Sequence, residues 1–224
     1  MTMRPRDALF AEFLGTLLLL LVTVGSQVAA SRLGGSDEFR ILLVNSLVTG
    51  FGISALILSL NPVSGACFNP LVAVLLCTEG ELKWKHLPAY LLSQFSGALL
   101  GVLLCHYLFG LPALEMASKA RPGLPLLVSE FIGAMGLLLV VHRVGNTRSQ
   151  AVAYAVGAYL MAGTWFLPST CLANPALTLA RMFTQTYAGI RPEDAAGFIA
   201  AQVLALAVFI GFLRAHKRLA VLGD

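Results

Sequence analysis

Apolar residues gather in six blocks along the chain, and each block approaches the length that crosses a lipid bilayer. The blocks cover residues 8–30, 41–60, 88–109, 125–142, 150–167 and 194–213. A transmembrane helix needs about 20 mostly apolar residues, because a bilayer core about 30 Å thick is crossed at about 1.5 Å per residue. The pattern therefore predicts six transmembrane helices.

Composition supports a membrane protein. Of the 224 residues, 58% are hydrophobic and 12% are charged, which is too little charge to cover the surface of a soluble domain of this size. The first apolar block follows Arg4 and Arg6, as in a signal peptide, but it is longer than a signal peptide's apolar region and contains Glu12. We interpret this block as a retained first span.

The formal net charge of +4 raises the question of nucleic acid binding, but the cations lie between the apolar blocks. Loops rich in Lys and Arg face the cytoplasm, so their distribution predicts orientation. Nine of the 15 Lys and Arg residues fall at the chain ends and in the second and fourth connections: Arg4, Arg6, Lys83, Lys85, Arg143, Arg148, Arg214, Lys217 and Arg218. This excess predicts that both termini are cytoplasmic, and nucleic acid is not an expected partner.

The chain also resembles itself. Three landmarks recur in the same order: residues 11–15 (AEFLG) in 129–133 (SEFIG), Asn69-Pro70-Leu71 in Asn174-Pro175-Ala176, and Gln94 in Gln202. We expect one channel domain over 1–224, built from a first half, 1–112, and a second half, 113–224. Each half holds three spans, an odd number, so the second half enters the membrane from the opposite side. Such inverted repeats place the functional site near the middle of the membrane, between the halves.

Two further segments, Cys67 to Cys77 and Ala173 to Phe183, are too short to span, at about half the length that a crossing needs. Asparagine favours the N-cap of a helix and proline its first position, so Asn69 and Asn174 predict two re-entrant half-helices. Their N-termini would meet in mid-membrane, and their partial positive charge would repel cations while a polar uncharged solute passes. Glu12 and Glu130 are expected to accept hydrogen bonds from the backbone beside each half-helix.

The two Asn-Pro signatures, preceded at the first by Ser64-Gly65-Ala66 and flanked by the paired Glu and Gln landmarks, resemble the aquaporin and aquaglyceroporin superfamily over essentially the whole chain. The resemblance implies an all-α membrane fold of six transmembrane helices plus two half-helices. It also implies a homotetramer with one pore in each subunit, surrounded by lipid in a bacterial inner membrane. The pore centre would be formed by Asn69, Pro70, Leu71, Asn174, Pro175 and Ala176.

The chain departs from this family at the constriction. The family usually has an arginine three residues after the second Asn, where this chain has Leu177. Spacing from the asparagines places Thr49, Ala162 and Cys171 at the other three positions, and none of them is a histidine or a large aromatic residue. These side chains predict a wider and more apolar opening. Arg181, one helical turn beyond Leu177, is expected to cap the half-helix or to face solvent.

A constriction without arginine and with threonine and cysteine resembles the aquaporin-like channels found with bacterial arsenic-resistance systems. The resemblance implies a trivalent arsenical such as arsenite, which is uncharged As(OH)3 at neutral pH, or a glycerol-like polyol. A water-conducting aquaporin and a transporter coupled to protons through Glu12 or Glu130 remain alternatives. No motif pairs a nucleophile with a base, so we do not expect an enzyme. The four cysteines lack CxxC spacing, so neither a disulfide framework nor a metal or other cofactor is expected.

Overall fold

The computed structural model describes residues 4–147 and 151–222, with side chains described as far as residue 216. Arg148, one of the cations in the fourth connection, therefore lies outside the described residues. Within these ranges the chain is helical and contains no strand. The longer helices are α1 (Pro5–Gly34), α2 (Glu38–Ser64), α4 (Leu87–Phe109), α5 (Leu124–Thr147), α6 (Val152–Phe166) and α8 (Pro192–Leu222). The shorter ones are α3 (Pro70–Glu79), α7 (Pro175–Ala180) and the 3₁₀ turns η1 (Trp84–His86) and η3 (Arg181–Phe183).

Five of the six predicted spans are long and apolar enough to cross a membrane: α1, α2, α4 together with η1, α5 and α8. The helix of the remaining block, α6, has 15 residues and is shorter than the prediction over 150–167. It ends at Phe166 because Leu167 is extended, with φ −112° and ψ 122°, as expected for the residue before a proline, here Pro168. The chain then continues at membrane depth toward Asn174.

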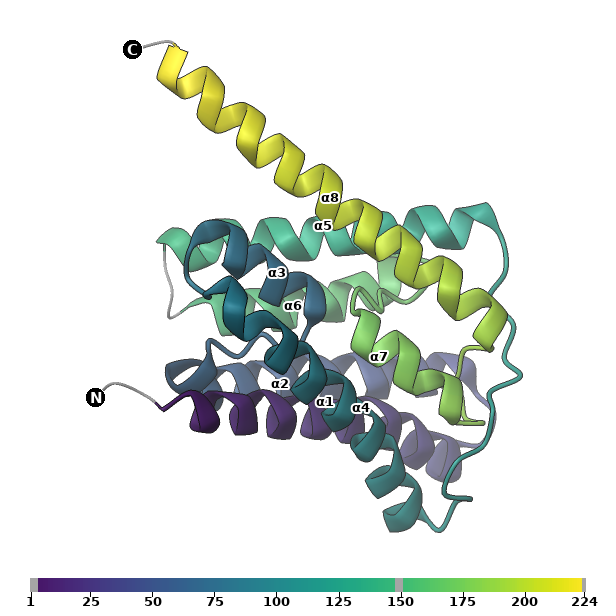
Figure 1. Ribbon diagram of the computed structural model, residues 1–224. Helices are drawn as coiled ribbons and strands as arrows, with labels where there is room; N and C mark the ends of the chain where they lie inside the picture. The colour runs from purple at the N-terminus through teal and green to yellow at the C-terminus, as the bar shows by residue number, and fades with distance from the viewer. Residues whose placement is uncertain (1–3, 148–150, 223–224) are drawn as a thin grey trace.

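The helices pack in two corresponding sets. In the first half α1 contacts α2 and α4, and in the second half α5 contacts α6 and α8. The halves are joined by α2 against α6 and by exchanged contacts of the short helices, α3 with α8 and α7 with α4. Figure 1 shows α3 and α7 in the middle of the bundle, with the longer helices around them. The fold is the predicted all-α membrane fold of inverted repeats.

Close approach of helices depends on glycine. A Cβ added at Gly97 of α4 would lie 2.3 Å from the Phe13 carbonyl oxygen of α1, and one at Gly101 would lie 2.4 Å from that of Leu17. In the contact between α2 and α6, a Cβ at Gly157 would lie 2.4 Å from the Gly50 carbonyl oxygen. Small residues let helix backbones touch, and van der Waals packing of this kind holds helices together in a bilayer.

The half-helices begin where the sequence predicts, because asparagine and proline act locally. The Asn69 side chain accepts a hydrogen bond of 2.9 Å from Leu71 N, and the Asn174 side chain accepts one of 3.0 Å from Ala176 N. Each following proline occupies a first-turn position, where its missing N–H costs nothing. Gly80 then ends α3 in the left-handed conformation, at φ 87°.

Candidate functional site

A buried carboxylate holds the loop that leads into α3. Glu12 Oε1 accepts hydrogen bonds from Ser64 Oγ at 2.7 Å and from Cys67 N at 2.9 Å. Its Oε2 accepts from Phe68 N at 2.9 Å and from Gln94 Nε2 at 2.8 Å. Glu12 is fully buried, so water cannot replace it as an acceptor. Without the carboxylate, these donors would lack a hydrogen-bond partner in apolar surroundings. The carboxylate fixes the loop of non-helical backbone in the membrane.

The second half repeats this arrangement at α7. Glu130 Oε1 accepts from Leu172 N at 2.9 Å, and its Oε2 accepts from Ala173 N at 2.9 Å and from Gln202 Nε2 at 2.7 Å. Glu130 is fully buried as well. Hydrogen bonds to an ionised carboxylate are stronger than those between neutral groups. The paired landmarks thus act alike in the two halves: each Glu accepts from two backbone N–H groups and from the Gln of its own half.

Both lead-in loops contain residues with positive φ at matching places. The residues three before each Asn, Ala66 and Cys171, have φ of 46° and 55°, and the residues one before, Phe68 and Ala173, have φ of 48° and 44°. Residues other than glycine seldom adopt this conformation, because the Cβ crowds the backbone. Such strain persists where the surroundings enforce it, and here the two carboxylates do so.

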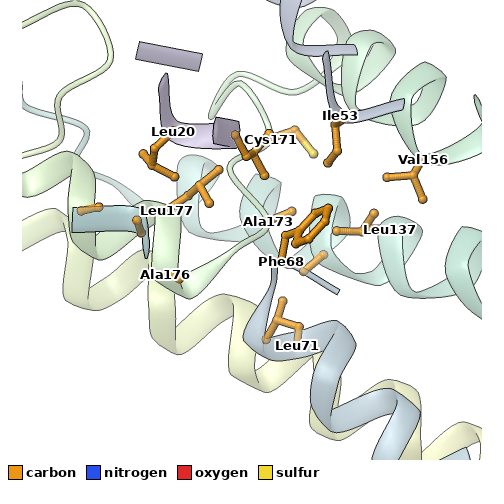
Figure 2. Close-up of a cluster of buried hydrophobic side chains, with 14 of the residues drawn as sticks. Leu20, Ile53, Phe68, Leu71, Leu137, Val156, Cys171, Ala173, Ala176 and Leu177 are labelled. Atoms are coloured by element: carbon orange, nitrogen blue, oxygen red, sulfur yellow. The ribbon is translucent and has the colours of Figure 1, made fainter. Parts of the chain in front are cut away.

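The two asparagines join the halves at the centre. Asn69 Nδ2 donates to the Ala173 carbonyl at 2.8 Å, and Asn174 Nδ2 donates to the Phe68 carbonyl at 2.8 Å. Each amide nitrogen carries a second N–H, and both asparagines line the central cavity. The remaining signature residues support the centre without lining that cavity: Pro70, Leu71, Pro175 and Ala176 are buried. Figure 2 shows Phe68, Ala173 and Leu177 together where the halves meet.

A cavity of about 480 Å³ runs beside these asparagines and is lined by both halves. Because α3 and α7 meet at their N-termini, their C-terminal ends mark opposite ends of the cavity. Glu79, near the end of α3, belongs to one end, and Arg181, just after α7, belongs to the other. Between them the lining combines apolar side chains with hydroxyl and amide groups, which suits a solute that is polar but uncharged.

Three of the four predicted constriction residues line the cavity, namely Thr49, Cys171 and Leu177. Ala162 does not line it, because its side chain is exposed on the outer face of α6. Thr164 lines the cavity in its place. An α-helix turns about 100° per residue, so a position two residues away lies on the opposite face. The assignment of Ala162 to the pore lining is therefore wrong, and Thr164 is the α6 residue that lines the cavity near this level.

Two lining residues that the sequence analysis overlooked are Asn45 and Thr23. Asn45 Nδ2 donates to the Thr23 carbonyl at 2.9 Å, to Ser26 Oγ at 2.9 Å and to Thr49 Oγ1 at 3.3 Å. Asn45 lies one helical turn before Thr49, on the same face of α2. A buried amide within an apolar span is the signal that identifies it, since polar side chains at membrane depth usually face a cavity.

Arg181 also differs from the prediction. We expected it to cap the half-helix or to face solvent, but its side chain is 6% exposed and lines the cavity. Its Nε is buried without a hydrogen-bond partner, and no described residue accepts a hydrogen bond from its guanidinium group. A cation thus faces the cavity after all, at a position different from that of the family's arginine.

Two more cations lie near Arg181, in the loop between α4 and α5. Burial lowers the pKa of Lys119 below the ordinary value of a lysine, and the charges of Arg121 and Arg181 lower it further. Glu38 opposes this shift. Burial also lowers the pKa of Arg121, while Glu130 and Asp194 raise it. Arg181 is thus the cation that lines this end of the cavity, and Lys119 and Arg121 lie near it outside the lining.

Apolar helices around two half-helices, which meet beside a polar cavity, define a membrane channel for small solutes. The chain belongs to the major intrinsic protein family, whose model matches residues 2–165. It is a passive channel and an integral membrane protein.

Relatives and a solved structure agree with this class. The aquaglyceroporin AqpS of Rhizobium meliloti (strain 1021) is 39% identical over 204 residues, which cover 91% of this chain and 87% of AqpS. The aquaporin NIP1-2 of Oryza sativa subsp. japonica is 28% identical, over 85% of this chain and 66% of its own length. The X-ray structure of the aquaglyceroporin from Plasmodium falciparum matches with a TM-score of 0.70 at 22% identity, covering 93% of this chain and 95% of that one. This structural match demonstrates the fold alone.

Proposed function

We propose that the channel conducts uncharged solutes larger than water, namely trivalent arsenicals such as As(OH)3 and glycerol-like polyols, through a constriction that lacks arginine at position 177. The observation that carries this proposal is the set of side chains around the cavity at its α7 end: Thr49, Thr164, Cys171 and Leu177. A water-selective constriction is narrowed by histidine, aromatic and arginine side chains. The aquaglyceroporin name of AqpS supports a polyol-sized permeant.

The lining suits a polyhydroxy molecule with one polar and one less polar side. Thr49 accepts a hydrogen bond from Asn45, and its own hydroxyl hydrogen remains to donate to a permeant oxygen. Leu177 and Cys171 offer apolar contact to the remainder of the molecule. The second N–H groups of Asn69 and Asn174 then donate to the same solute at the centre. The solute thus passes through a series of weak binding sites.

Passive flow also fits the state of the two buried carboxylates. Both oxygens of Glu12 and of Glu130 accept hydrogen bonds from protein donors, and neither carboxylate lines the cavity. A transporter coupled to protons through Glu12 or Glu130 would need that carboxylate to face the substrate site. We therefore expect an imposed pH gradient to leave the initial rate of uptake in vesicles unchanged; accumulation driven by the gradient would support the transporter instead.

We further propose the family's assembly for this chain. It would form a homotetramer with one pore per subunit in a bacterial inner membrane. Both termini would lie in the cytoplasm, and the inverted halves would comprise 1–112 and 113–224. The distribution of Lys and Arg supports this orientation.

Replacing Leu177 with arginine tests the constriction directly. Leu177→Arg should lower glycerol and arsenite permeability at least about tenfold and water permeability less than about threefold, because a longer charged side chain narrows the opening. Leu177→Met, which keeps the volume and apolar character, is the matched control and should conduct like the wild type. Stopped-flow measurements on proteoliposomes give all three rates. An equal loss of every permeant by a normally folded Leu177→Arg protein would contradict the size argument.

A further inference from the structure

Arg181 lies one turn beyond the predicted constriction. It opens η3 directly after α7, four residues after Leu177, and both residues line the same cavity. Four helical residues advance about 6 Å along the axis. The guanidinium therefore belongs to the same path as Leu177, closer to the end of the cavity that the loop 111–123 covers.

The guanidinium group lacks the protein partners that the neighbouring cations have. Arg121 Nη1 donates to the Ser169 carbonyl at 3.1 Å and its Nε to the Gly189 carbonyl at 3.3 Å. Lys119 Nζ donates to the Tyr187 carbonyl at 3.1 Å. Among the described residues none accepts from Arg181, which is 6% exposed and whose Nε is fully enclosed.

An unpaired cation in such a place does not stabilise the fold. Burying a charge without a partner is unfavourable, and pairing or hydrogen bonding normally compensates for it. Arg181 can recover hydrogen bonds from what occupies the cavity, because its five N–H donors point to no protein acceptor. Its placement is therefore better explained by an interaction with the permeating solute than by a role in folding.

We propose that Arg181 is the specificity-determining cation of this pore: it donates hydrogen bonds to an oxygen of the neutral permeant and excludes cations. The inference rests on the proposed function, since it assigns selectivity within that conduction path. The pore would then divide between two positions the selection by size and the selection by charge, which one arginine performs elsewhere in the family. Leu177 and its neighbours limit solute size, and Arg181 limits solute charge about one turn away.

The charges around Arg181 strengthen this exclusion. Arg121 and Lys119 add positive potential at the same end of the cavity. Glu130, the carboxylate that acts on Arg181, uses both of its oxygens for the backbone before α7 and for Gln202. Glu38 lies near Lys119 and Asp194 near Arg121, but neither carboxylate lines the cavity. A small organic cation thus meets Arg181 in the path with no described carboxylate paired to it.

The test compares a cation with neutral solutes of similar size in proteoliposomes. In Arg181→Gln we expect methylammonium uptake to rise at least about tenfold, while water and glycerol rates stay within about threefold of the wild type. Arg181→Lys keeps the charge and should exclude methylammonium as the wild type does. Lys83→Gln removes the same amount of charge at an exposed position that does not line the cavity, and it should change methylammonium uptake less than about threefold.

The possible outcomes separate the two hypotheses. Wild-type protein that carries no neutral solute would contradict the proposed function itself. Wild-type conduction of glycerol together with equal methylammonium exclusion by the wild type and Arg181→Gln would overturn the role of Arg181. The thermal unfolding temperature adds an independent readout: Arg181→Gln should unfold no lower than the wild type, and a marked drop would assign Arg181 a structural role and overturn the inference.

Discussion

Glu130→Gln should destabilise the folded protein by about 2–4 kcal/mol, since it leaves buried donors unsatisfied. The carboxylate receives three hydrogen bonds, two from backbone N–H groups and one from Gln202. A glutamine side chain offers one acceptor oxygen and places an NH2 group where the second oxygen stood, so donor faces donor. The non-helical backbone before Asn174 then loses the group that holds its positive φ angles.

A matched control is available in Glu115, which is exposed in the loop between α4 and α5. Glu115→Gln removes the same charge without breaking a buried hydrogen bond, and we expect it to unfold like the wild type. Thermal unfolding and size-exclusion profiles of the detergent-solubilised proteins measure the difference. Equal stability of the two variants would show that the carboxylate does not hold the loop.

Gly97→Ala should destabilise the protein by about 1–3 kcal/mol, as overpacking at a tight contact does. The added methyl group would lie 2.3 Å from the Phe13 carbonyl oxygen, and because this atom belongs to the backbone, it cannot rotate away. The helices α1 and α4 would have to separate. Since α1 also carries Glu12, the lead-in loop of α3 would move with it.

Gly211 provides the control for helix propensity. It lies in α8, and a Cβ built there meets no atom within 4 Å. Alanine favours a helix over glycine by about 1 kcal/mol, so Gly211→Ala should be as stable as the wild type or more stable. If Gly97→Ala also proved neutral in the same unfolding assay, the close packing of α1 on α4 would not contribute to stability as described.

The features that local chemistry determines were predictable from the sequence. Asn69 and Asn174 start the half-helices because an asparagine cap followed by proline acts within one turn. The paired Glu and Gln landmarks predicted a repeat, and three spans in each half predicted its inversion. Both features can be recognised in the sequence without any knowledge of packing. The length of α6 was not predictable from hydropathy, because Pro168 ends the helix before the apolar block ends.

Which of the proposed constriction residues line the cavity could be predicted only where the register was certain. Cys171 and Leu177 lie three residues from Asn174 on either side, and both line the cavity. Ala162 was placed by counting back through the loop after Leu167, where Thr170 has φ 67°. Within a helix, residue spacing determines which face a side chain is on, but it does not do so across such a loop. Thr164 rather than Ala162 therefore lines the cavity.

The burial of Arg181 depends on contacts between distant segments. Ala117 N donates to the Met182 carbonyl at 2.8 Å, and Glu115 N donates to the Phe183 carbonyl at 3.3 Å. The loop after α4 thereby covers η3, which would otherwise face solvent. Sequence reasoning placed an arginine near a helix end, where it commonly stabilises the last carbonyls. It had no means of locating the loop that encloses it.

The central claim is that this pore passes uncharged solutes larger than water. The most direct measurement is the flux of arsenite, glycerol and water into proteoliposomes that contain the purified wild-type protein. We predict that arsenite and glycerol enter at least about tenfold faster than into protein-free vesicles, with no dependence on membrane potential. Fast water flux with arsenite and glycerol at the rate of empty vesicles would contradict the wide constriction.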